Sequence, residues 1–289
     1  MPTLTNELND RSSPLYRWFE SKHNAAGDRL IVNHNQAMSG SHIIRPPGRI
    51  EDFGLLGTAF VYAYRWHLGI LAGNFHETPA NYFLSHVQVN SLFAAKTSRE
   101  KAIACLIFAA FEVQYRCGHL HEIGSVLLAA NDKKIKPELS YASVMVEDLV
   151  NLIDSIDFFG DSPLTACSKA SAHLNPTFAG SEYISADGQQ IVNGCLIKCF
   201  TTLKRSPFNR RHLWQQIAYV LMDWDNRYKI SAVSWYYSRQ KAVFTYPVER
   251  LFKNLPSLRR EFKSFILDTY DEDWDYDSPF TAKEFYFCQ

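Results

Sequence analysis

Residues 184–203 read ISADGQQIVNGCLIKCFTTL, and this stretch decides which fold we expect. Its centre, Asn193-Gly194, is typical of two-residue turns between antiparallel strands, because both residues tolerate positive φ. The residues before and after this pair have a strand-like composition. The stretch therefore predicts a β-hairpin with strands over residues 183–192 and 195–203.

The turn also predicts the register of the hairpin, because loop length determines which residues face each other. Counting outward gives four facing pairs: Val192 with Cys195, Ile191 with Leu196, Gln189 with Lys198, and Asp187 with Phe200. Side chains alternate between the two faces of a strand. One face of the hairpin should therefore carry Asp187, Gln189, Lys198 and Phe200.

The segments after the hairpin suggest a mixed sheet flanked by helices. A helix is expected from Ser206-Pro207 or Asn209 to about Trp224, because these residues favour helix starts. Strands are expected over residues 230–237 and 242–246. A last helix should begin at Pro256 or Ser257 and reach about Leu267.

The sequence before Asn175 has the periodicity of helices instead. We expect helices over residues 15–22, 53–71, 79–93, 98–115 and 144–156, with residues 1–50 otherwise irregular. The chain is thus predicted to be α+β and to have three parts. These are a mainly helical region (1–174), a sheet-containing core (175–255), and a C-terminal helix with an acidic, aromatic tail (256–289).

Composition limits the possible classes of protein. The chain has 289 residues, 46% apolar content and a net charge of +0, so no global charge attracts it to nucleic acid. Six cysteines are scattered without a CxxC pair, which indicates reduced, buried thiols, including Cys195 and Cys199 on one strand face. The N-terminus has no signal-peptide pattern, and the apolar run 102–111 is too short to span a bilayer. We therefore expect a cytoplasmic protein with no membrane partner.

Several short motifs within residues 175–247 resemble the RecB-like type of the PD-(D/E)XK nuclease superfamily. They are Asn175-Pro-Thr-Phe-Ala-Gly-Ser, Ala186-Asp187, Ile191-Val192-Asn193-Gly194, and Leu196-Ile197 ahead of Thr201-Thr202. A looser similarity lies at residues 52–60. The resemblance implies a restriction-endonuclease-like sheet core flanked by helices.

In that family, one hairpin strand supplies an Asp and the other an Asp/Glu-x-Lys triplet, and the carboxylates hold Mg²⁺. The resemblance places the first Asp at Gln189 and the triplet at Lys198-Cys199-Phe200, so only the nearby Asp187 remains. Gln189 offers one neutral oxygen, Lys198 a cation and Phe200 no ligand. We expect a degenerate site without a metal or other cofactor, in which Asp187 and Lys198 form a salt bridge.

RecB-like nucleases also carry a Gln-x-x-x-Tyr motif on the helix after the triplet strand, and Gln215 and Tyr219 match it. The resemblance implies that this helix face is aimed at the site. At the start of the same helix lie four cations that suit phosphate groups of DNA or RNA, unless they belong to a solvated loop: Lys204, Arg205, Arg210 and Arg211.

Three further groups of residues are candidate sites. Cys117, His119, His121 and Glu122 lie close in sequence but lack a second ligand pair with zinc spacing, so we expect no metal there. Glu112 and Arg116 are one helical turn apart, which favours an ion pair over catalysis. Asp268 to Asp277 interleaves acidic residues with aromatics, which is typical of a solvated tail or of a segment that docks on a basic protein partner.

Three functions remain open from the sequence. The first is an inactive nuclease-fold protein, not an enzyme, that serves as a scaffold or nucleic-acid-binding subunit in DNA repair or phage defence; that setting rests on analogy alone. The second is an active Mg²⁺-dependent nuclease with a relocated site using Glu182, Asp187 and Lys198. The third is a protein-interaction module that does not touch nucleic acid.

Overall fold

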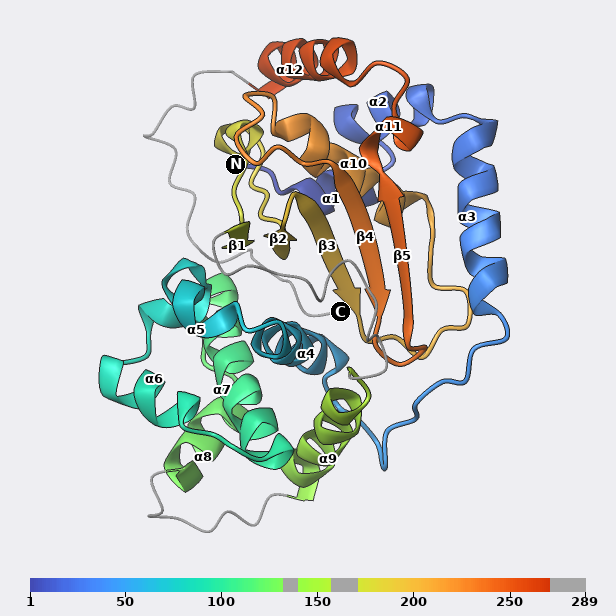
Figure 1. Cartoon of the computed structure of the whole chain (residues 1–289). Coiled ribbons are helices and arrows are strands. Elements are labelled where there is room, and N and C mark those ends of the chain that lie inside the picture. Colours follow the sequence, from blue (N-terminus) through green and yellow to red (C-terminus); the bar gives the residue numbers. More distant parts are fainter. Residues whose placement is uncertain (132–139, 157–170, 271–289) are drawn as a thin grey trace.

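A computed structural model describes residues 1–131, 140–156 and 171–270, and it contains a sheet of five strands (Figure 1). The strands lie in chain order: β1 (Ala172–Leu174), β2 (Gln190–Val192), β3 (Cys195–Phe200), β4 (Ala232–Tyr237) and β5 (Ala242–Pro247). β3 and β4 are parallel, and the other neighbours are antiparallel. The predicted α+β fold with a helical N-terminal part is confirmed.

The predicted hairpin is also present, with Asn193 at φ 50° and Gly194 at φ 73° forming the turn. Its register is the predicted one where the ladder exists, because Ile191 faces Leu196 and Val192 faces Cys195. The strands are shorter than predicted, however. Residues 183–189 leave the hairpin because they pair elsewhere: Ser185 bridges to Thr3, and Asp187 bridges to Thr177.

Helix α10 (Arg210–Met222) makes the parallel pairing possible, because it carries the chain back across the sheet between β3 and β4. The side chain of Asn209 caps it by accepting a hydrogen bond from the backbone nitrogen of His212 at 3.1 Å. The helix therefore starts at the second of the two predicted positions. After β5 come α11 (Val248–Leu251) and α12 (Leu255–Tyr270).

More of the N-terminal region is helical than predicted. They are α1 (Leu4–Asn9), α2 (Pro14–Lys22), α3 (Ala25–Met38), α4 (Phe53–His67), α5 (Leu71–Asn74), α6 (His86–Phe93), α7 (Ser98–Cys117), α8 (Glu122–Asn131) and α9 (Ser140–Asp154). The expectation that residues 1–50 are mostly irregular is thus wrong. The single helix predicted over 79–93 is wrong too, because Ser85 caps a new helix there in a capping box with Gln88. No helix in the described ranges is long and apolar enough to cross a membrane.

The two faces of the sheet pack against two different groups of helices. On one face, Cys195, Ile197 and Cys199 are buried against α4, α7 and α9, so the predicted core thiols of β3 are confirmed. On the other face, Leu196 lies in a cluster with residues of α1, α2, α10 and α12. The expected boundary at residue 174 passes through the sheet, because β1 precedes it and α1 and α2 pack with the C-terminal helices (Figure 1).

A buried ion pair connects the helical layer to the sheet. Arg239, in the turn between β4 and β5, donates to both carboxylate oxygens of Asp148 on α9 at 3.0 and 2.5 Å, and both side chains are fully buried. Arg239 also donates to the backbone oxygen of Ile44 at 3.1 Å. This pair therefore joins three segments that lie far apart in the sequence.

Replacing Asp148 by Asn should lower the free energy of unfolding by about 3–5 kcal/mol, because it leaves the Arg239 charge buried without a counter-ion. Denaturant titration followed by tryptophan fluorescence measures the change. Glu261→Gln provides the control, since it breaks the exposed pair with Lys22 and should cost less than about 1 kcal/mol. Equal losses in the two variants would show that burial does not control the strength of the Arg239–Asp148 pair.

Candidate functional site

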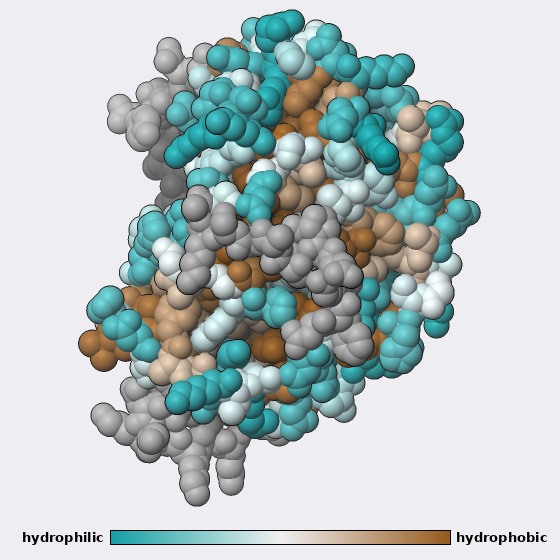
Figure 2. All heavy atoms as spheres, in the orientation of Figure 1, coloured by the Kyte–Doolittle hydropathy of each residue, from teal (hydrophilic) through white to brown (hydrophobic). Residues whose placement is uncertain are grey.

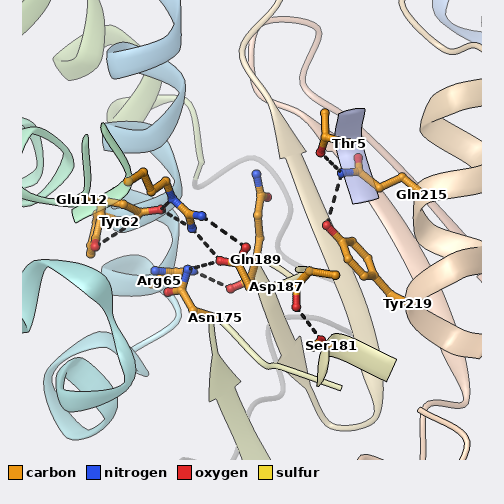
Figure 3. A network of polar contacts seen from close by, with 12 residues as sticks. Thr5, Tyr62, Arg65, Glu112, Asn175, Ser181, Asp187, Gln189, Gln215 and Tyr219 are labelled. Atoms are coloured by element: carbon orange, nitrogen blue, oxygen red, sulfur yellow. Dashed lines mark hydrogen bonds and ion pairs between the residues drawn. The ribbon is translucent and has the colours of Figure 1, made fainter. Parts of the chain in front are cut away.

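The residues of the predicted degenerate site lie just before β2 and in the last part of β3. Figure 3 shows Tyr62, Arg65 and Glu112 on helices at one side and Gln215 and Tyr219 on α10 at the other, with Asp187 and Gln189 between them. Lys198 and Phe200 occupy the end of β3. The structure thus brings the hairpin residues and the Gln-x-x-x-Tyr motif to one place, as the sequence predicted.

Asp187 is held by Arg116, at the end of α7, and not by Lys198. The Nη2 atom of Arg116 lies 2.5 Å from Asp187 Oδ2, and Nη1 lies 3.2 Å from Oδ1. The prediction of a salt bridge between Asp187 and Lys198 is therefore wrong, because the ion pairs of the described residues do not include it. The physical reason is that residues 183–189 leave the ladder, which turns Asp187 away from β3 and toward α7.

The same guanidinium group also binds Glu112, which confirms the predicted ion pair one helical turn apart. Arg116 Nη2 lies 2.9 Å from Glu112 Oε1, and the other carboxylate oxygen of Glu112 accepts the hydroxyl of Tyr62 at 2.8 Å. Because one nitrogen lies 2.9 and 2.5 Å from the two carboxylate oxygens, those oxygens are within 5.4 Å of each other. A cation thus occupies the space between two carboxylates.

These contacts set the charge states. Burial alone would raise the pKa of Asp187, but the charge and hydrogen bonds of Arg116, with help from Asn175, hold that pKa below 3.8. Burial alone would likewise lower the pKa of Arg116, but Glu112 and Asp187 raise it above its ordinary range. At neutral pH the site therefore holds an ionised Asp187 and a permanently charged Arg116.

The side chain and the backbone oxygen of Gln189 both accept hydrogen bonds from other parts of the fold. Its side-chain Oε1 accepts a hydrogen bond from the backbone nitrogen of Cys199 at 2.7 Å, where a partner strand would otherwise supply the acceptor. The backbone oxygen of Gln189 accepts from Arg65 Nη2 at 2.5 Å, and Gln190 Oε1 accepts from Arg65 Nε at 3.1 Å. Arg65 is 1% exposed and was not identified as a site residue from the sequence. The available signal in the sequence was a single arginine within the largely apolar stretch 53–66.

Lys198 points toward α10, on the other side of the sheet from Arg65. Its Nζ donates a hydrogen bond to Gln215 Oε1, which confirms that the Gln-x-x-x-Tyr face is aimed at the hairpin. Gln215 Nε2 lies 3.2 Å from both Thr5 Oγ1 and Tyr219 Oη, and Lys198 Nζ lies 5.4 Å from the ring centre of Phe200. Burial lowers the pKa of Lys198 to about 8, although the charge of Asp187 acts in the opposite direction.

The other sequence candidates for a metal do not come together. No group of three or more His, Cys, Asp or Glu side chains in the described residues is arranged to hold a metal ion. His119 Nδ1 contacts the backbone oxygen of Cys117, and His121 instead lies 3.4 Å from Asp52. The carboxylates best placed for a cation are Glu112 and Asp187, and Arg116 already lies between them.

The four predicted phosphate-binding cations lie in the loop before α10 and in the first turn of that helix. Lys204 and Arg205 are exposed in the loop before α10, and Gln240 holds this loop by donating to the backbone oxygens of Thr202 and Lys204 at 2.9 Å each. On α10, Arg211 is exposed, whereas Arg210 pairs with Asp28 of α3 at 2.9 Å. Among the ion pairs of the described residues, Arg210 is thus the one of the four whose charge is already partly compensated.

Part of the predicted acidic docking segment can be placed. Asp268 and Tyr270 belong to α12, and the hydroxyl of Tyr270 donates to Glu7 of α1, while residues 271–277 lie outside the described residues. An exposed aromatic surface was missed in the sequence. Figure 2 shows a hydrophobic patch at the left edge, in the region of α6. Val87 of α6 is 78% exposed, and Tyr82, at the end of the preceding 3-10 helix η2 (Pro79–Tyr82), is 72% exposed.

The stability of wild type relative to Lys198→Met should rise between pH 8 and 9.5. The unfolded chain keeps its lysine proton up to about pH 10.4, whereas the folded chain releases it near pH 8, so rising pH favours the folded state in that window. Urea titrations at pH 7 and 9.5 measure the difference. Lys204→Met is the control, because it removes an exposed lysine outside the site. A wild-type to Lys198→Met difference that is constant with pH contradicts the assignment.

Comparisons with known proteins do not add to this geometry. No family model, no curated protein and no solved structure was found to match the chain. The function proposed for the chain therefore rests on the site itself.

Proposed function

We propose that this protein is a nuclease-fold protein of the PD-(D/E)XK type that has lost cleavage and serves as a nucleic-acid-binding subunit or scaffold. One observation carries the proposal: the guanidinium group of Arg116 lies between Glu112 and Asp187, and Asp187 is the carboxylate two residues before Gln189, where the resemblance implies a metal ligand. The mixed sheet flanked by helices and the Gln215–Lys198 contact support it further. A role in DNA repair or phage defence is part of this proposal only as the setting in which such subunits act.

Electrostatics argue against a metal beside Arg116. Mg²⁺ needs hard oxygen ligands in a nearly ideal octahedron. Two unit charges of the same sign repel by about 4 kcal/mol at 4 Å and an effective dielectric of 20, and a dication doubles that value. Since Asp187 and Glu112 both bind Arg116, a metal must displace a guanidinium group that these two carboxylates hold.

The relocated site has less support. It needs Glu182, Asp187 and Lys198 to act together, but Glu182 is exposed on the 3-10 helix η5 (Ala179–Glu182), and Asp187 is held by Arg116. Lys198 meanwhile donates to Gln215 on the α10 side. A protein-interaction module remains the second candidate. Tyr82 and Tyr115 are exposed, and their ring centres lie 5.0 Å apart, so they form an aromatic surface beside α6.

Nucleic-acid contact is proposed for the loop before α10 and its first turn. Lys204, Arg205 and Arg211 are exposed there, close to the positive end of the helix dipole.

The wild-type protein should not cleave DNA or RNA with Mg²⁺ or Mn²⁺, because Arg116 occupies the space between the carboxylates. Gel assays on single- and double-stranded substrates test this. Metal-dependent cleavage that Asp187→Ala abolishes would overturn the proposal and favour the relocated site.

A matched variant tests the physical reason. Arg116→Met removes the guanidinium group and leaves Glu112 and Asp187 with oxygens that can approach one cation. Mg²⁺ or Mn²⁺ should then raise the melting temperature of Arg116→Met and leave that of wild type unchanged, since a ligand that binds only the folded state stabilises it. An equal response of both proteins would show that Arg116 does not exclude the metal.

Duplex DNA binding should depend on salt through the loop before α10. Arg205→Ala combined with Arg211→Ala should reduce the slope of log affinity against log salt by about 0.9 for each lost phosphate contact. Arg210→Ala should change it less, because Arg210 is paired with Asp28. Fluorescence anisotropy over a salt series measures the slopes, with Arg99→Ala on α7 as the control for the loss of one positive charge. If all variants share the wild-type slope, phosphates do not bind at α10.

A further inference from the structure

We propose that helix α3 is a strap that is docked on the sheet at neutral pH and is released in acid, when the side chain of His34 takes up a proton. The proposal goes beyond the proposed function, and the release itself does not depend on it. It is carried by the way in which α3 is attached, because this helix inserts a buried histidine among aromatic rings of the sheet.

Helix α3 has few buried residues for its length. Of its 14 residues, only His34 and Met38 are buried, and Val32 is 51% exposed. Figure 1 shows the helix at the edge of the molecule, beside β5. A helix with so few buried contacts depends strongly on each of them, so a change at His34 is felt by the whole of α3.

The ring of His34 lies among aromatic rings of the loop before α10 and of the strands β4 and β5. The nearest ring centres are those of Phe208 at 4.0 Å and Phe244 at 3.9 Å. Three further ring centres lie 5.4 to 6.2 Å away and belong to Tyr237, Trp235 and Tyr246. Because His34 is 1% exposed, these rings keep water away from the imidazole.

The site offers little to compensate a positive charge on His34. Nδ1 lies 3.5 Å from the hydroxyl of Tyr246, while Nε2 is buried and has no hydrogen-bond partner among the described residues. The titratable side chains of the described residues that face the ring are Tyr237 on β4, Tyr246 on β5 and His212 on α10, and none of these types is negative in acid. Aromatic faces attract a cation, but this attraction is smaller than the cost of removing an ion from water. The docked ring is therefore neutral.

The direction of the pH effect follows from these contacts. Burial lowers the pKa of His34 from 6.5 to about 3 while α3 is docked, and the charge of His212 acts in the same direction. After release the ring is in water, so its pKa returns to about 6.5. The released form therefore binds a proton that the docked form does not bind in this window. Each pH unit below 6.5 favours release about tenfold, down to about pH 3, and no such effect exists above pH 6.5.

Release of α3 also changes the start of α10. The side-chain nitrogen of Asn35 donates to the backbone oxygen of Phe208 at 2.8 Å, and its side-chain oxygen accepts from the backbone nitrogen of Phe208 at 3.1 Å. Asp28 of α3 pairs with Arg210 at 2.9 Å. When α3 leaves, the loop loses this clamp and Arg210 loses its anion. That Arg210 then becomes free for a phosphate is the one consequence that rests on the proposed function.

Hydrogen–deuterium exchange of the full chain tests the proposal. Exchange of the backbone amides of α3 and α4 is followed by peptide mass spectrometry at pH 7 and pH 5, and each rate is divided by that of an unstructured chain at the same pH. The corrected rate of α3 should rise on the order of tenfold at pH 5, and that of α4 should stay constant. His34→Phe keeps an aromatic ring that cannot take up a proton, so it should abolish the rise.

His212→Phe is the matched control for the second histidine, and it should keep the rise at pH 5. Retention of the rise in His34→Phe overturns the proposal, and so does a loss of the rise in His212→Phe alone, which assigns the proton to His212. An α3 rate that stays constant, or that rises together with the α4 rate, also overturns it, and both results are read from wild type without any substitution. The measurement contains no nucleic acid, so failure of the proposed function remains distinguishable.

Discussion

The early end of the β2–β3 ladder is the constraint on which the candidate site depends. The pairing stops at Gln190 and Ile197, while β3 runs on to Phe200. Residues 198–200 of β3 therefore have no paired residue in β2, and the side chain of Gln189 supplies the acceptor for the backbone nitrogen of Cys199. Because residues 183–189 leave the hairpin, Asp187 is free to reach α7 instead of β3.

Cations from the helices compensate the negative charges and the unpaired oxygens that this arrangement brings together. Asp187 and Glu112 would repel each other across a short distance, and Arg116 removes the repulsion by binding both. Arg65, fully enclosed, satisfies the backbone oxygen of Gln189 and the side chain of Gln190. Two guanidinium groups thus engage the oxygens of Glu112, Asp187, Gln189 and Gln190.

The two faces of the sheet separate two kinds of chemistry. Arg65 and Arg116 approach from α4 and α7 and are engaged by oxygens, whereas Lys198 points to α10 and finds a neutral amide. The two sides of the sheet therefore offer different electrostatic environments. This separation is why Asp187 binds a cation of α7 and Lys198 binds a neutral amide of α10.

Local sequence was enough for the turn, the register next to it and the helix that follows, because these depend on φ preferences and on fixed side-chain periodicity. It also showed that residues 189 and 198, where the resemblance implies carboxylates, are Gln and Lys. The aim of Gln215 toward the hairpin was expected from the resemblance. Tertiary structure alone decided where the ladder ends, which cation binds Asp187, and that Arg65 belongs to the site. Those outcomes depend on contacts between residues 71 and 124 positions apart in the chain, and hydrophobic packing of α4 and α7 against the sheet sets them rather than any local pattern.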